Sequence, residues 1–366
     1  MPGDVISVPD LRAGISKWYQ MNKRTLPWRG SHDPYLIWIS EIIFQQTRIK
    51  QGISYYRRFI TRFPDLSSLA RADEREVLKL WEGLGYYARA RNLHETARYL
   101  WVQRRGKFPE TFAGIRALKG IGDYTAACIA SICYGLPYAA VDGNVYRVVS
   151  RLYADSTPID TGAGKRHYRQ LAQALLDPVN PGDFNEAMMD LGATCCTRAN
   201  PACPLCPLQR FCLAHRNRSE INFPVKSRKL NRKKRFFHYF FILTDDQIWL
   251  HKRTGNDIWR GLYELPLLES AGPEFFSPAI RDPKLVYTQI HRLTHQDIRI
   301  RYYRPIEWTA DPDFFDDEII RVPVARLPEF PLPKPLKQFI SGRLAEFNRL
   351  IVFQPPVKPV EKYPLP

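Results

Sequence analysis

The spacing of apolar residues changes once along the chain, and this change limits the possible folds more than any other feature of the sequence. Before Leu213, apolar residues recur mostly at helical spacing, and short turns with Gly, Pro or Asp separate the stretches. From Phe236 onward, short runs such as FFHYFFIL and DIRIRYYR are β-branched and aromatic, which is typical of strands. A chain of 366 residues is also too long for one core. The sequence therefore predicts a multidomain protein with an all-α first domain and an α+β second domain.

The boundaries of these domains follow from composition. We expect the helical domain over residues 1–215, a linker over 216–235, the second domain over 236–350 and a Pro-rich tail over 351–366. The linker holds nine Lys and Arg residues and one acidic residue, a composition typical of a solvated connection. The second domain is predicted to end in a helix from Gln338 to Ile351, which the proline-rich tail cannot continue.

The net charge restricts the choice of partner. The chain carries 54 Lys and Arg against 37 Asp and Glu, a formal charge of +17, which indicates a polyanion such as nucleic acid or an anionic membrane surface. No apolar stretch approaches the roughly 20 residues of a membrane span, and the first residues lack the pattern of a secretory signal. We therefore expect a cytoplasmic protein without a membrane segment, associated with the nucleoid if bacterial.

Four of the seven cysteines form one compact pattern. They are separated by six, two and five residues in a loop over 196–212: Cys196, Cys203, Cys206 and Cys212. Structural zinc favours paired short knuckles, so the wider spacing favours a [4Fe-4S] cluster held by four thiolates. Four unliganded thiols in a polar loop are the third possibility. Several nearby arginines favour a structural centre that shapes a basic, DNA-facing loop.

Two glycines one residue apart separate two predicted helices. In the run Gly120, Ile121 and Gly122, the two glycines have no Cβ atom, so their backbone N–H groups can approach a phosphate at a helix N-terminus. An amphipathic helix before them and the small-residue helix TAACIASI after them predict a helix-hairpin-helix over about 112–133 that clamps a DNA strand. An ordinary glycine turn between helices is the alternative.

Two carboxylates have the surroundings of catalytic groups. Glu41 is the only charge in the apolar helix expected over 36–44, so burial should raise its pKa and leave it partly protonated at neutral pH, as a general acid requires. Asp142 precedes another predicted helix, where an ordinary N-cap is the alternative. Two carboxyl groups on either side of a sugar are the equipment for cleaving a glycosidic bond.

Seven motifs lie in the same order as in a known family. They are LPWR at 26–29, SEIIFQQT at 40–47, GLGYYARARNL at 83–93, LKGIGDYTA at 118–126, VDGNVYRV at 141–148, NEAMMDLGA at 185–193 and the four-cysteine loop. Together they resemble the MutY adenine DNA glycosylases of the helix-hairpin-helix superfamily. The resemblance implies a monomeric enzyme of base excision repair that flips adenine out of double-stranded DNA and excises it where it is mispaired with 8-oxoguanine or guanine.

The resemblance also implies roles for the motif residues. Glu41 would protonate N7 of adenine and then activate water, and Asp142 would stabilise or trap the C1′ oxocarbenium ion. The other residues would orient this pair or bind substrate: Tyr124 and Asn144 beside the carboxylates, Trp28, Arg29 and Glu186 in the adenine pocket, and Gln46 and Tyr86 in the base stack.

The second domain resembles the Nudix-like domain that this family uses to inspect the opposite strand. Residues 259–266, WRGLYELP, are similar to its signature, but the helix with metal-binding acids that a Nudix hydrolase needs does not follow. The stretch Leu293, Thr294 and His295 aligns with a Phe-Ser-His turn that reads 8-oxoguanine in relatives. Thr294 keeps the hydroxyl, and Leu293 lacks the aromatic ring.

Position 124 distinguishes the main alternative. Relatives of the endonuclease III type carry a lysine there, whose amine attacks C1′ and then drives strand cleavage. Tyr124 cannot form that imine, so we expect a monofunctional glycosylase. The alternatives are a bifunctional endonuclease III-like glycosylase/lyase or thymine mismatch glycosylase, a non-enzymatic DNA-binding protein with a structural metal, and a Nudix-type pyrophosphatase.

Overall fold

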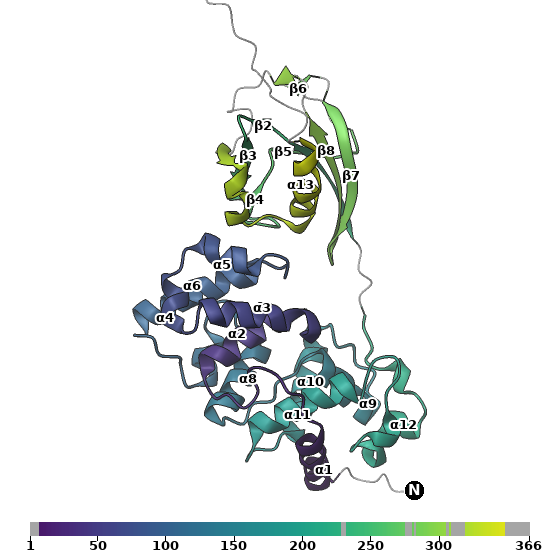
Figure 1. Ribbon diagram of the computed structural model, residues 1–366. Coiled ribbons are helices and arrows are strands. Elements are labelled where there is room, and N and C mark those ends of the chain that lie inside the picture. The colour runs from purple at the N-terminus through teal and green to yellow at the C-terminus, as the bar shows by residue number, and fades with distance from the viewer. Residues whose placement is uncertain are drawn as a thin grey trace, which may run out of the picture. The chain divides into compact units, whose positions relative to one another are not determined.

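The chain forms two compact units in a computed structural model that describes residues 7–227, 232–274, 280–281, 283–304, 307–308 and 319–347 (Figure 1). The first unit comprises Met1–Ala72 and Arg89–Lys229, and the second comprises Asp73–Ala88 and Leu230–Pro366. The first unit is helical and the second contains the strands, as the sequence predicts. The predicted tail over 351–366 lies outside the described residues. No helix among those residues is long and apolar enough to cross a membrane.

Short helices with polar caps build the first unit. They are α1 (Val8–Asn22), α2 (Pro34–Phe44), α3 (Ile49–Arg62), α4 (Leu66–Arg71), α6 (Ala88–Gln103), α7 (Phe112–Arg116), α8 (Asp123–Tyr134), α9 (Gly143–Tyr153), α10 (Gly162–Leu175), α11 (Pro181–Thr194) and α12 (Leu213–Arg216), with 3-10 turns η1 (Cys203–Leu205), η2 (Gln209–Phe211) and η3 (Glu220–Asn222). Asp33, Thr111 and Asp142 each accept a backbone N–H of the following helix, which satisfies donors that have no partner within the helix.

The packing of the helices brings the predicted site residues together. Helices α1, α9, α10 and α11 share an apolar cluster that includes Leu11, Val149, Tyr168 and Leu191, and each such buried side chain contributes about 1.5 to 3 kcal/mol. Helix α8 packs against α2, α7 and α11, and α11 packs against α9. Helices α2, α8, α9 and α11 therefore carry predicted site residues into one region: Glu41, Tyr124, Asn144 and Glu186.

Two sheets and a C-terminal helix build most of the second unit. A four-stranded sheet has the order β5 (Leu267–Ser270), β1 (Lys233–Phe240), β8 (Gln296–Arg304) and β7 (Lys284–Arg292), in which only β1 and β8 pair in parallel. A second sheet has the order β10 (Ile319–Pro323), β3 (Gln247–Lys252) and β2 (Leu243–Thr244), with β4 (Tyr263–Glu264) also paired to β3. A short pair joins β6 (Ile280–Arg281) to β9 (Glu307–Trp308).

Helical elements complete this unit: α5 (Glu74–Trp81), η5 (Val324–Glu329) and α13 (Lys334–Phe347). Figure 1 draws α13 against the sheet that holds β7 and β8, and Phe339 of α13 stacks on Tyr302 of β8 with ring centroids 3.9 Å apart. Helix α13 begins at Lys334, four residues before the predicted start.

The segment over 216–235, predicted as a linker, is part of the folded units at both of its ends. Ser227 bonds to Asp160 and the Val225 carbonyl accepts from Ile159, so this part packs on the first unit. Strand β1 begins at Lys233, and the nearly buried Arg235 pairs with Asp257 and Glu269. Composition alone did not reveal the strand, because a basic residue can lie in a sheet where carboxylates of other strands and loops neutralise it. Residues 228–231 lie outside the described residues.

Candidate active site

Glu41 lies near the end of α2 in surroundings that favour its protonated form. Burial raises the pKa of Glu41 to about 7, and the nearby carboxylates Asp142 and Glu186 act in the same direction, whereas Tyr124 and Arg29 oppose the rise. The end of α2 is fixed by Arg89, whose NH1 donates to the Ile42 carbonyl at 2.7 Å, to Ile43 at 3.1 Å and to Gln45 at 2.6 Å. A carboxyl group in this state can donate a proton at neutral pH.

Asp142 is the N-cap of α9, as the alternative interpretation held. Its Oδ1 accepts the backbone N–H groups of Asn144 at 2.8 Å and Val145 at 2.7 Å, and its Oδ2 accepts Asn144 Nδ2 at 2.7 Å. Burial raises the pKa of Asp142, while these hydrogen bonds and Arg147 oppose that rise. The cap geometry does not exclude a catalytic role, because the same carboxylate is close enough to Glu41 to raise its pKa.

Tyr124 completes the group around Glu41. It lies in the first turn of α8, interacts with the Glu41 carboxyl group and donates to the Met189 sulfur at 3.2 Å. Cys128, one turn later, is also buried beside Glu41 and Tyr124. The spacing of four between Tyr124 and Cys128 on one helix places them on a shared face.

Asn144 connects Asp142 to the cysteine loop through a residue that sequence reasoning missed. Arg147 NH2 donates to Asn144 Oδ1 at 2.9 Å, and Arg147 Nε donates to the Cys196 carbonyl at 2.8 Å. The spacing of three between Asn144 and Arg147 on a predicted helix is a signal for this contact, but nothing in the sequence indicates that Cys196 lies within reach.

Arg29 and Glu186 line a cavity of about 600 Å³ together with Tyr19 and Arg24. Arg29 NH1 pairs with Glu186 Oε2 at 2.5 Å, and the Tyr19 hydroxyl donates to the same oxygen at 2.7 Å. Trp28 is buried and packs on the rings of Phe44 and Tyr56 at 4.5 and 5.1 Å. The structure thus brings Arg29 and Glu186 into direct contact, while Trp28 supports α2 from the core.

The two residues expected in the base stack share an uncommon backbone conformation. Gln46 has φ 57° and Tyr86 has φ 49°, in the left-handed region that non-glycine residues rarely adopt, and both side chains are exposed. In the second unit, the Tyr86 hydroxyl lies 2.6 Å from Thr294 Oγ1. Leu293, Thr294 and His295 form the turn between β7 and β8, which a bond from Leu293 N to the Gln296 carbonyl closes at 2.8 Å.

The turn between α7 and α8 has the geometry of a hairpin. Gly120 has φ 79°, and a Cβ there would lie 2.7 Å from the Asn92 Cβ, so only glycine fits. Gly122 is the N-cap of α8 with open space around it, and Ile121 is buried and anchors the turn. Asp123 does not place an uncompensated charge beside the hairpin, because it pairs with Arg116 at 2.6 Å and Arg169 at 2.5 Å. Hydrogen bonding from Arg116 accordingly lowers the pKa of Asp123.

The four predicted ligand cysteines lie close together, and none of them forms a disulfide. Burial raises the pKa of Cys196, Cys203 and Cys212, and neighbouring thiols raise each of them further. The fully buried Arg151 donates to Cys196 Sγ at 3.3 Å and to the Thr197 carbonyl at 2.7 Å. Four thiolates in this space require a positive centre between them, so the donor set fits an iron–sulfur cluster.

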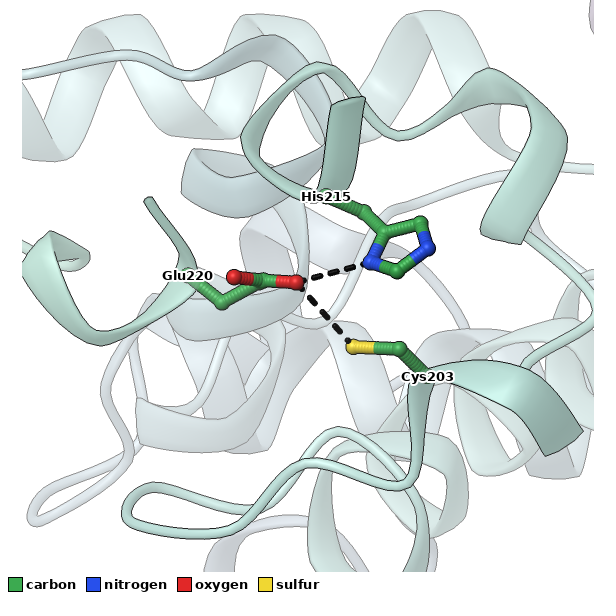
Figure 2. A group of neighbouring side chains, drawn as sticks. All are labelled: Cys203, His215 and Glu220. Atoms are coloured by element: carbon green, nitrogen blue, oxygen red, sulfur yellow. Dashed lines mark hydrogen bonds and ion pairs between the residues drawn. The ribbon is translucent and has the colours of Figure 1, made fainter. Parts of the chain in front are cut away.

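Two further groups lie against this loop, as Figure 2 shows. His215 Nδ1 lies 2.7 Å from Glu220 Oε1, and Cys203 Sγ lies 3.5 Å from the same oxygen. The ligand atoms of Cys203, His215 and Glu220 lie within 4.8 Å of one another, close enough to hold a metal ion. Because Cys203 also belongs to the four-cysteine set, His215 and Glu220 lie beside the predicted cluster site.

Comparison with known proteins assigns the family. A model described as HhH-GPD superfamily base excision DNA repair protein matches residues 39–176, and a NUDIX domain model matches residues 238–342. The adenine DNA glycosylase of Buchnera aphidicola subsp. Acyrthosiphon pisum (strain APS) is 35% identical over 253 residues, which cover 69% of this chain and 72% of that protein. The chain belongs to the adenine DNA glycosylase family.

Further relatives agree with this assignment. The adenine DNA glycosylase of Mus musculus is 42% identical over 221 residues, which cover 58% of this chain and 43% of the mouse protein. The solved structure of a thermostable thymine-DNA glycosylase is 26% identical with a TM-score of 0.53, covering 57% of this chain and 97% of that one. The chain is therefore a DNA N-glycosylase with a helix-hairpin-helix fold, and the predicted enzyme class and family are confirmed.

In this adenine DNA glycosylase, the acid of the Nudix-like signature is a buried structural residue. Glu264 accepts from the Tyr239 hydroxyl at 2.6 Å and from Arg253 NH1 at 2.6 Å, and it pairs with His251 at 3.1 Å. The element that follows is strand β5, where a Nudix hydrolase needs a helix with metal-binding acids. This arrangement gives no support to the pyrophosphatase alternative.

Proposed function

We propose that this adenine DNA glycosylase excises adenine mispaired with 8-oxoguanine, and with guanine, and leaves the abasic strand uncleaved. The observation that carries the proposal is the position of Glu41, a carboxyl group with its pKa raised by burial to about 7, beside the hydrogen-bonded carboxylate Asp142. An enzyme with this function acts on DNA, which in a bacterial cell means at the nucleoid, and the proposal requires only one chain.

Glu41 is the general acid and then the general base. Adenine is a poor leaving group until a ring nitrogen is protonated, and a carboxyl group with its pKa raised by burial to about 7 is partly protonated at neutral pH. Donation to N7 leaves Glu41 as a carboxylate. That carboxylate then takes a proton from the attacking water, so the group returns to its starting state.

Asp142 stabilises the positive charge that develops at C1′ as the bond to adenine breaks, or it traps C1′ covalently. The three hydrogen bonds to its carboxylate favour the ionised form and fix its orientation before the reaction. Asn144 supplies two of them, and Tyr124 orients the Glu41 carboxyl group.

The flipped base binds at Arg29 and Glu186. Both residues line the cavity of about 600 Å³, which is ample for one purine. Glu186 is a carboxylate that can accept the exocyclic amino group of adenine, whereas guanine and hypoxanthine present an oxygen there. Gln46 and Tyr86 fill the vacated stack, and their left-handed backbone supports a role in which exposed side chains are held away from the protein.

The rest of the chain positions the duplex. Gly120 and Gly122 bring backbone N–H groups to a phosphate, and Ile121 anchors that turn. Leu293, Thr294 and His295 contact the opposite base, with the Thr294 hydroxyl as the hydrogen-bonding group. A [4Fe-4S] cluster on the four cysteines would supply rigidity to the basic loop, with Arg151 holding Cys196.

A single-turnover assay tests the function. Duplexes with one 8-oxoguanine:adenine, guanine:adenine or thymine:guanine pair are incubated with excess enzyme, and the products are separated before and after alkali treatment. We expect adenine release from the first two duplexes and strand breaks only after alkali, because Tyr124 has no amine to form an imine. Strand cleavage without alkali, or release of thymine alone, would contradict the proposal.

A further inference from the structure

Two arginines and two carboxylates alternate behind the cavity that holds Glu186. Asp190 lies one turn after Glu186 on α11 and is fully buried. Its Oδ1 accepts Arg24 Nε at 2.8 Å, Arg24 NH2 at 2.6 Å and Arg29 NH2 at 2.9 Å, and its Oδ2 accepts the backbone N–H of Arg24 at 3.0 Å. Two positive and two negative side chains thus balance one another in a nearly buried network.

Arg29 divides its guanidinium between the two carboxylates. NH2 donates to Asp190 Oδ1 and NH1 pairs with Glu186 at 2.5 Å from Oε2, while the buried Nε has no partner in the described part of the chain. The Tyr19 hydroxyl donates to the same Glu186 Oε2 at 2.7 Å. Both partners of Glu186 therefore share one oxygen, and no residue in the described part of the chain donates to its Oε1.

This arrangement is not the one that an isolated pair would adopt. An arginine and a carboxylate prefer two parallel hydrogen bonds, one to each oxygen. Such a pair would occupy both oxygens of Glu186. Asp190 disfavours it by drawing Arg29 NH2 away from Glu186, and the Tyr19 hydroxyl is a second donor to Glu186 Oε2.

We infer that Asp190 and Tyr19 are positioning residues that keep Glu186 Oε1 open to accept the exocyclic amino group of the flipped base. The inference rests on the proposed function, because it takes adenine as the base that enters this cavity. According to this inference, Asp190 and Tyr19 make the enzyme prefer a base with an amino group at C6, although neither residue touches the base. A base without that amino group gains nothing from an open Oε1.

The test compares bases that differ only at C6. Single-turnover rate constants are measured with adenine, purine or hypoxanthine opposite 8-oxoguanine, and each variant is compared with the wild type on the same base, so that differences in bond lability cancel. Asp190→Asn removes the negative charge that attracts Arg29, so the guanidinium of Arg29 shifts toward Glu186. We expect the rate constant for adenine to fall by about ten to a hundredfold, as for loss of a hydrogen bond to a charged group, while purine changes little.

Asp257→Asn in the second unit is the matched control. Asp257 also lies between two arginines, at 2.7 Å from both Arg235 and Arg253. The substitution therefore perturbs a similar network in the unit that does not contain Glu186. It should leave the ratio of adenine to purine unchanged. Melting temperatures of both variants measure the purely structural effect of removing the carboxylate.

Two other variants keep the inference testable if Asp190→Asn does not fold. Tyr19→Phe removes one donor from Glu186 Oε2 without changing charge and should lower the ratio of adenine to purine by several fold. Asp190→Glu keeps the charge that holds Arg29 and should retain most of the wild-type ratio. An equal loss for adenine and purine, or an unchanged ratio in both Asp190→Asn and Tyr19→Phe, overturns the inference. A wild-type enzyme that releases no adenine would instead refute the proposed function.

Discussion

Arg147 NH2 donates to the Asn144 side-chain oxygen at 2.9 Å, while its Nε donates at 2.8 Å to the backbone carbonyl of Cys196, the first cysteine of the four-cysteine loop. Asn144 in turn donates to Asp142 Oδ2 at 2.7 Å. The orientation of Asp142 therefore depends on a side chain that is anchored in the four-cysteine loop. Under the proposed function, order in that loop therefore affects the reaction at Asp142 through Asn144 and Arg147.

We expect Arg147→Gln to slow adenine release by about tenfold, because Asn144 loses the donor that fixes its amide and Asp142 becomes less well oriented. Single-turnover rate constants measure this effect. Arg326→Gln, which removes an exposed pair with Glu329, is the control and should not change the rate. Equal rates in both variants would show that the Arg147 contact has no role in the reaction.

Glu41→Gln should abolish adenine release and leave binding to the mispaired duplex nearly intact, because glutamine keeps the shape and removes the proton. In the wild type, the chemical step should slow as pH rises through about 7, where Glu41, with its pKa raised by burial, loses its proton. Single-turnover rates between pH 5.5 and 9 test this, since a rate that rises across this range is incompatible with Glu41 as the acid.

The same substitution should also change stability with pH. The folded protein holds the Glu41 proton more tightly than the unfolded chain, because burial raises the pKa of Glu41 from about 4.5 to about 7. Stability from this group is therefore lost as pH rises through that interval. Above pH 7 we expect Glu41→Gln to be more stable than the wild type by about 3 kcal/mol, measured by denaturant unfolding at pH 5 and pH 8.

Asp142→Asn separates the two roles of the N-cap. Asparagine caps helices nearly as well as aspartate, so the free energy of unfolding should change by less than about 1 kcal/mol. The neutral amide cannot balance the charge at C1′, and adenine release should fall by at least about a hundredfold. Asp65→Asn, at the cap of α4, is the matched control and should affect neither quantity strongly.

The purified protein should be brown and contain about four irons per chain, because the thiol spacing suits a cluster. Absorbance between 350 and 450 nm and iron analysis measure this directly. Cys203→Ser should reduce DNA binding and solubility more than the rate constant of the bound enzyme. A colourless protein with one zinc per chain is the contrary result.

Thr294→Ala should reduce the preference for 8-oxoguanine over guanine by less than about tenfold, because one neutral hydrogen bond contributes only about 0.5 to 1.5 kcal/mol. The comparison requires both duplexes under single turnover. Tyr86→Phe removes only the hydroxyl that lies 2.6 Å from Thr294 Oγ1, so it tests whether that contact supports the reading of the lesion. A preference unchanged in both variants would remove the turn from lesion recognition.

Sequence reasoning succeeded where one local pattern determines the environment. The apolar run of α2 predicts apolar surroundings and a raised pKa for Glu41, and the glycines at 120 and 122 predict a tight hairpin, because helix periodicity and backbone freedom act over a few residues. The cap position of Asp142 was equally readable from the residues that follow it. The family resemblance then joined these local features into one site.

The residues that it missed belong to contacts between distant segments. Tyr19 and Glu186 are 167 residues apart, and Arg24 and Asp190 are 166 apart, so no local pattern links them. Arg235 was assigned to a linker because its basic neighbours dominate the composition, although Asp257 and Glu269 neutralise it in the sheet. Charge balance of this kind depends on the three-dimensional fold.

The buried contacts of Glu264 give this acid a structural role in the second domain. Both of its oxygens have partners inside the domain, namely Tyr239, Arg253 and His251, so this buried acid holds strands together. A mutation at Glu264 should therefore appear as loss of a folded domain, whereas the same letter in a hydrolase marks lost chemistry. A sequence motif can thus remain recognisable in a domain where its acidic residue stabilises the fold and does not take part in a reaction.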